Sequence, residues 1–232
     1  MYRDDNEATN DSEQYRGPRR YRSDRMLALS DGVFAFAITL LVLDLVVPTL
    51  GDGGDIIEAL LSGWPGYLVY LISFATIGAI WLAHTAITDH LDHTNSTFIR
   101  LNLLVLLFVS FLPYPTRFLS TFIYSERPER VALALYGCAV LLLTGLLWTL
   151  WQYANRAGLF ASDVPEDDRA LFTQRMIPGI IVYMLLIAVG WILPVVALVG
   201  YALIALFFIF PLRFRKFRAV KLRADQAARS TD

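Results

Sequence analysis

The stretch Arg25-Met-Leu-Ala-Leu-Ser-Asp-Gly32 runs directly into Val33-Phe-Ala-Phe-Ala-Ile-Thr-Leu-Leu-Val-Leu43, so a polar beginning leads into an apolar segment. Ser30 and Asp31 lie one turn inside that segment. Polar groups buried in lipid cost free energy unless they find hydrogen-bond partners. The stretch therefore predicts a membrane helix whose polar residues contact neighbouring helices.

Composition indicates a polytopic membrane protein. Hydrophobic residues make up 56% of the chain, and the mean hydropathy is +0.50. A membrane-spanning helix needs ~20 mainly apolar residues. Six such segments are present, near 25–49, 64–88, 97–121, 130–155, 170–190 and 193–212. We therefore predict an all-α fold with six transmembrane helices, the last two forming a tight hairpin.

Basic residues gather before the first segment and after the last one, which places both ends in the cytoplasm of a protein of the plasma membrane. We predict a disordered cytoplasmic tail at 1–22, a transmembrane domain at 23–212 and a basic cytoplasmic tail at 213–232. The intervals 89–96 and 156–169 then also face the cytoplasm. We expect no cleavable signal peptide, because the first apolar segment is too long for one.

Few residues suggest a metal, a cofactor or a modification. Cys138 is the only cysteine, which excludes an intramolecular disulfide. His90, Asp92 and His93 could bind a metal, but a solvent-exposed loop is the favoured interpretation. Asn95-Ser96-Thr97 matches a glycosylation site on the predicted cytoplasmic side, so we interpret it as a chance match or as a helix N-cap. We expect no metal, no cofactor and no nucleic-acid partner.

The first segment has two different sides. At about 100° per residue, one stripe carries Phe36, Thr39, Leu40 and Leu43. Asp31 points about 140° away from Phe36, toward neighbouring helices. On periodicity alone, such a stripe is typical of ordinary core packing.

Polar residues on the second and third segments are candidate partners for Ser30 and Asp31. They are Trp81, His84, Thr85, Thr88 and Asn102, and they lie at the predicted cytoplasmic end together with Arg25, Ser30 and Asp31. The set could be a proton relay or an ion site, or it could be a structural network that holds three helices together. The single carboxylate favours the structural network, because a dehydrated cation needs several oxygen ligands.

The motif Arg25-x-x-x-Leu29-Ser30-Asp31-Gly32 resembles the Arg-x-x-x-Phe-Ser-Asp-Gly signature of the prokaryotic branch of the transmembrane protein 175 potassium channels. The apolar continuation to Asp44 and the stretch 101–115 are also similar to that family. The resemblance implies a homotetramer of six-helix subunits, whose first helices line a central pore. It also implies that the chain lacks a Thr-Val-Gly-Tyr-Gly filter.

Transferred position by position, the resemblance implies pore-constricting layers at Phe36, Leu40 and Leu43. Thr39 corresponds to the threonine linked to selectivity. The resemblance also implies an interhelical network of structural supports, rather than ion ligands, that consists of Arg25, Ser30, Asp31, Trp81, His84 and Asn102. Two departures stand out: Leu29 replaces the motif phenylalanine, and Phe36 occupies a layer that is commonly isoleucine or leucine.

The expected function is passive, potassium-preferring cation conduction through an apolar constriction that is gated by dewetting. Potassium is then the permeant ion rather than a cofactor. Asp44 and the acidic loop of Asp52, Asp55 and Glu58 either enrich cations at the outer mouth or form a solvated surface. The alternative is a proton-coupled transporter that uses Asp31 and His84. An enzyme is not expected, because no nucleophile and base share a depth.

Overall fold

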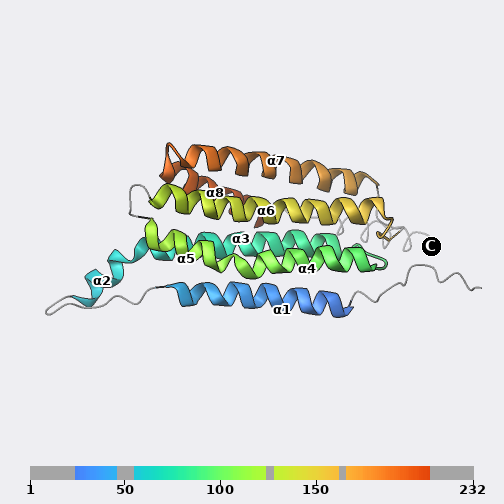
Figure 1. The fold of residues 1–232 in the computed structure, drawn as a ribbon, viewed down its shortest axis with the longest axis horizontal. Helices are drawn as coiled ribbons and strands as arrows, with labels where there is room; N and C mark the ends of the chain where they lie inside the picture. Colours follow the sequence, from blue (N-terminus) through green and yellow to red (C-terminus); the bar gives the residue numbers. More distant parts are fainter. Residues whose placement is uncertain (1–23, 46–54, 124–127, 162–165, 210–232) are drawn as a thin grey trace, which may run out of the picture.

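The computed structural model describes residues 24–45, 55–123, 128–161 and 166–209, which form a bundle of helices (Figure 1). The predicted tails at 1–22 and 213–232 lie outside these ranges. The elements are α1 (Asp24–Leu40), η1 (Leu41–Asp44), α2 (Ile56–Ser62), α3 (Trp64–Thr88), α4 (Ser96–Phe111), α5 (Pro113–Phe122), α6 (Pro128–Arg156), α7 (Glu166–Gly190) and α8 (Pro194–Ile209).

The first predicted segment is a helix that tightens at its end. α1 continues as the 3-10 helix η1, and the backbone becomes extended at Leu45. A 3-10 helix has three residues per turn, so Leu43 lies almost in line with Leu40 rather than displaced as on an ideal α-helix. The predicted residues 46–49 lie outside the described part of the chain.

The third predicted segment matches one candidate span, Ser96–Phe122, whose helix is interrupted at Leu112. α4 ends at Phe111 and α5 begins at Pro113, whose ring nitrogen cannot donate the hydrogen bond of a helix interior. At the break, the Leu112 N–H donates to the Val109 carbonyl, three residues earlier, at 3.2 Å. At the other end, the Asn95 side chain accepts from the Phe98 N–H at 2.9 Å, which confirms the N-cap interpretation.

The predicted hairpin is confirmed, because only residues 191–193 separate α7 from α8 and the two helices pack together. In the described residues, four helical stretches are long and apolar enough to span a membrane: Asp24–Asp44, Trp64–Thr88, Ser96–Phe122 and Pro128–Arg156. The apolar helices Met176–Gly190 and Pro194–Ile209 are shorter. The described chain is thus a helical membrane domain of four candidate spans and an apolar hairpin.

The helices form a layered bundle with α1 at one edge and α7 at the other, while α8 runs beside α7 and packs against α3 (Figure 1). α1 packs against α3 and α4, while α6 contacts α4, α5 and α7. The segments after α3 and α6 meet at one end, where the Asp92 N–H donates to the Leu159 carbonyl at 2.9 Å. This contact agrees with the prediction that 89–96 and 156–169 lie on the same side.

Candidate functional site

The outward side of α1 carries large apolar residues that no other described helix covers. Phe36 is 64% exposed and Leu43 is 75% exposed. Thr39 is also exposed, whereas Leu40 is half-buried. We call Phe36, Thr39, Leu40 and Leu43 the outward face; it is the stripe that the sequence predicts. This face is exposed because α1 lies at the edge of the bundle, with other helices on one side only (Figure 1).

The opposite side of α1 is part of the protein core. Phe34 is 1% exposed, and Ala37 and Leu41 are also buried. Ala37 lies on the side that packs against α3 and α4, where small residues let membrane helices approach closely. The helix is therefore held on one side and open on the other.

A chain of hydrogen bonds links α1, α4 and α3 behind this packing. His84 Nε2 lies 2.7 Å from Asn102 Oδ1, and Asn102 Nδ2 donates to Ser30 Oγ at 3.0 Å. Ser30 Oγ in turn donates to the Met26 carbonyl at 2.9 Å. Because the Asn102 amide nitrogen is already a donor to Ser30, the Asn102 oxygen accepts a hydrogen bond from the His84 Nε2–H. The bonds then all run in one direction and end on a backbone carbonyl.

The other members of the predicted polar set lie differently. Trp81 Nε1 donates to Asp31 Oδ1 at 2.9 Å, which is a second link between α3 and α1. The His84 ring also packs on Phe34, with ring centroids 5.4 Å apart. Arg25 is exposed, and within the described residues it has no hydrogen bond or ion pair that would join it to this set.

Asp44 does not extend the outward face. Its side chain is only 15% exposed, and its Oδ1 lies 4.0 Å from Nε of Arg117 on α5. Asp55, in the predicted acidic loop, caps α2 by accepting from the Ile57 N–H at 2.9 Å. Two of the acids considered for the outer mouth thus have partners within the protein, Asp44 beside Arg117 and Asp55 at the start of α2.

The loop histidines also make local contacts. His90 Nδ1 lies 2.7 Å from the Ala86 carbonyl, and His93 Nδ1 lies 3.1 Å from Asp92 Oδ2. Among the described residues, no group of three potential ligands gathers closely enough to hold a metal ion. Cys138 is exposed on α6.

A second buried polar cluster was not predicted from the sequence. Thr116 Oγ1 donates to Ser73 Oγ at 3.0 Å, and Tyr136 Oη donates to Thr76 Oγ1 at 3.1 Å. Ser73 Oγ donates to Tyr136 Oη at 3.4 Å, so the cluster joins α3, α5 and α6. The sequence shows these hydroxyl residues scattered inside apolar segments. Single hydroxyl residues are common in membrane helices, so none of them indicates a cluster.

Comparisons with known proteins agree with this architecture. The sequence profile described as "Endosomal/lysosomal potassium channel TMEM175" matches residues 25–113. A potassium channel of Streptomyces collinus is 33% identical over 187 residues, covering 80% of this chain and 91% of the relative. The endosomal/lysosomal proton channel TMEM175 of Bos taurus is 33% identical over 140 residues, covering 56% of this chain and 29% of the relative.

A solved structure supports the same assignment. The crystal structure of a lysosomal potassium-selective channel TMEM175 homolog from Chamaesiphon minutus superposes with a TM-score of 0.74 and 30% sequence identity. The match covers 83% of this chain and 98% of that one. These relatives are named as ion channels, not enzymes. From its helical architecture, the motif on α1 and these matches, the chain belongs to the TMEM175 channel family.

Proposed function

We propose that this chain is the subunit of a potassium-preferring cation channel in the plasma membrane, with both ends in the cytoplasm. Four copies assemble so that their outward faces surround a central pore. The observation that carries the proposal is the one-sided packing of α1, with Phe34 buried and Phe36 uncovered on the same helix. Cyclic assembly gives each copy of that face the same position around one axis.

Thr39 fits a role beside the permeant ion. Its hydroxyl donates to the Phe36 carbonyl at 2.9 Å, so the proton is engaged within the helix. The oxygen lone pairs remain available to a cation. Four such oxygens at one level would partly replace the water that potassium loses in a narrow passage.

Phe36, Leu40 and Leu43 serve as the apolar constriction. A cation cannot shed its water there without compensating oxygens, so a narrow collar of these side chains blocks conduction while it stays dry. Conduction then requires the side chains to move apart. The exposure of Phe36 and Leu43 leaves them room to change rotamer without disturbing the core.

Purified protein in liposomes tests the proposal. A potassium gradient with no proton or sodium gradient should drive flux, and the current should reverse near the potassium equilibrium potential. Crosslinking in the membrane should give a tetramer as the largest product. A monomer, or no potassium flux in liposomes that contain folded protein, contradicts the proposal.

Phe36→Ala should raise potassium flux roughly tenfold, which corresponds to about 1.4 kcal/mol off the barrier. Phe207→Ala is the matched control, because Phe207 on α8 has the same 64% exposure as Phe36 but lies on another helix. Flux should not change in that control. Equal effects of the two substitutions on potassium flux would mean that Phe36 does not line the pore.

The second candidate function is a proton-coupled transporter that uses Asp31 and His84. It is supported by the bovine relative, which is named as a proton channel. The chain spans only 29% of that bovine relative, however. The hydrogen-bond chain from His84 passes through the Asn102 amide and ends on a backbone carbonyl. An amide does not release and regain protons as an acid or an imidazole does, so this arrangement favours a structural role.

A further inference from the structure

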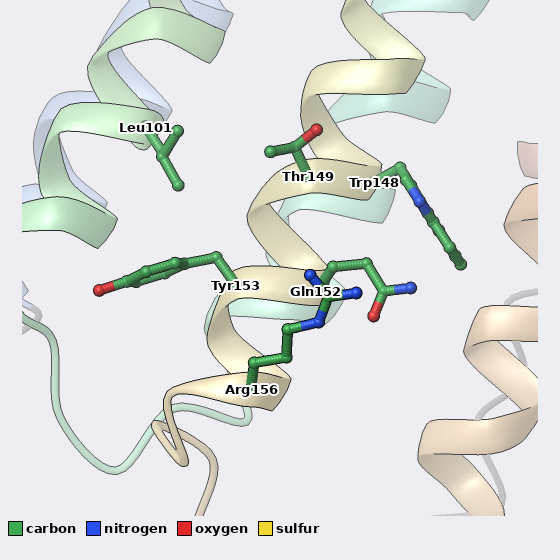
Figure 2. Close-up of a pocket in the computed structure, with 6 residues that line it drawn as sticks. All are labelled: Leu101, Trp148, Thr149, Gln152, Tyr153 and Arg156. Atoms are coloured by element: carbon green, nitrogen blue, oxygen red, sulfur yellow. The ribbon is translucent and has the colours of Figure 1, made fainter.

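A cavity opens on the surface formed by α4 and α6, at the end of the bundle where α6 finishes. Its volume is about 300 Å³, at the lower end of the range for small-molecule sites. Figure 2 shows the residues that line it: Leu101 from α4, and Trp148, Thr149, Gln152, Tyr153 and Arg156 from α6. The cavity lies away from the outward face of α1.

The walls of the cavity combine apolar surface with fixed polar groups. Tyr153 is held in place by Asn95, whose Nδ2 donates to Tyr153 Oη at 3.0 Å. The Thr149 hydroxyl donates to the Gly145 carbonyl at 2.8 Å, so its proton is not available to a ligand. Leu101 provides an apolar wall on the α4 side.

Three donors remain for a ligand. The side chains of Trp148, Gln152 and Arg156 have no hydrogen-bond or ion-pair partner among the residues that the structure describes. They supply an indole N–H, an amide NH₂ and a guanidinium, all on α6. Donors of this kind together with one fixed positive charge suit an anion that has several acceptor oxygens.

The direction of the Arg156 side chain strengthens this argument. An arginine at the end of a membrane helix commonly extends into water. Figure 2 shows the Arg156 side chain running back along α6 to the level of Gln152. The guanidinium therefore lies beside the cavity, at the end of a helix that is long and apolar enough to span a membrane. The ends of such helices lie at the level of the lipid headgroups.

We propose that this cavity binds the phosphodiester headgroup of an anionic phospholipid, with Arg156 as the charged anchor and Gln152 and Trp148 as additional donors. A lipid fits better than a free anion because the cavity that holds the polar donors is also lined by the apolar side chain of Leu101, at the end of a candidate membrane span. In the proposed topology this end faces the cytoplasmic leaflet, where anionic lipids are common.

Thermal unfolding of the full chain in detergent, followed by tryptophan fluorescence, tests the proposal. The probes are short-chain phosphatidylglycerol, short-chain phosphatidylcholine and inorganic phosphate. Phosphatidylglycerol should raise the unfolding midpoint in a saturable way, and the other two should not. Arg156→Gln should raise the phosphatidylglycerol concentration needed for half of the effect about tenfold, as expected for a lost charge-assisted bond.

Arg100→Gln is the matched control, because Arg100 is an exposed arginine near the start of α4 that does not line the cavity. That variant should respond to phosphatidylglycerol like the unaltered protein. Arg156→Lys keeps the charge, should bind more weakly than the unaltered protein and more tightly than Arg156→Gln, and still tests the site if Arg156→Gln does not fold. Equal responses to both lipids, equal loss in both glutamine variants, or stabilisation by inorganic phosphate alone would overturn the proposal.

Discussion

The two sides of α1 differ in what surrounds them and in the chemistry that they carry. The inner side buries Ser30 and Phe34 against α3 and α4, and Ser30 accepts a hydrogen bond from Asn102. The outward face leaves Phe36 and Leu43 uncovered. In the proposed channel, the polar residues position the helix and the apolar residues of the outward face act on the ion. A buried polar residue in a membrane helix need not lie on the transport path.

The largest expected effect is the loss of stability in Phe34→Ala, compared with Phe36→Ala on the same helix. Phe34→Ala should lower the free energy of unfolding by about 3 to 5 kcal/mol, because Phe34 is 1% exposed and its removal leaves a cavity beside His84. Phe36→Ala is the control and should change stability by less than about 1 kcal/mol. Thermal unfolding of the two variants measures both values. Equal losses would mean that the sides do not differ in packing.

The next effect concerns the hydrogen-bond chain. Asn102→Leu should lower the free energy of unfolding by about 2 kcal/mol, because His84 Nε2 and Ser30 Oγ both lose a partner. Asn155→Leu, at an exposed position on α6, should have little effect. Potassium flux per assembled channel should be unchanged in both. A large loss of flux from fully folded Asn102→Leu protein would place the polar chain on the transport path.

A smaller effect is expected at Thr39. Thr39→Ala should lower the potassium to sodium permeability ratio about fivefold, which corresponds to about 1 kcal/mol. Thr121→Ala is the control, since Thr121 is an exposed threonine whose hydroxyl also bonds back along its own helix, at 2.9 Å from the Arg117 carbonyl. Reversal potentials under bi-ionic conditions give the ratio. An unchanged permeability ratio would mean that Thr39 does not contribute to ion selectivity.

The smallest effect is expected at Asp31. Asp31→Asn keeps an oxygen that can accept from Trp81 Nε1, so stability should fall by less than about 1 kcal/mol. Potassium flux should stay within about twofold of the unaltered protein, with or without a pH gradient. A proton-coupled transporter predicts the opposite result, since an amide cannot carry the proton. Loss of flux together with loss of its pH dependence would favour that alternative.

Much of the fold follows from local sequence signals. Apolar length locates the helices, Asn95 marks the start of α4, and the short link after Gly190 makes the α7–α8 hairpin. The outward face was also predictable, because the regular repeat of an α-helix groups Phe36 with Thr39 and Leu40.

The remaining features depend on contacts that one sequence does not show. The break at Pro113 was missed because apolar length alone does not show where a helix stops. Asp44 lies beside Arg117, which comes from a distant part of the chain. The cluster around Tyr136 joins three helices, and the spacing of its members carries no repeat that would reveal it. Pairings between helices are set by packing, which local patterns do not encode.

The edge position of α1 also has a genetic consequence. In the proposed tetramer, any substitution on the outward face occurs four times around one axis. A change of about 0.5 kcal/mol per subunit becomes about 2 kcal/mol, or roughly thirtyfold, when all four copies act together. If altered and unaltered subunits mix at random in equal amounts, only about one tetramer in sixteen lacks the altered subunit. A substitution at Phe36 should therefore affect most of the channels in such a mixture, in proportion to the number of altered subunits in each.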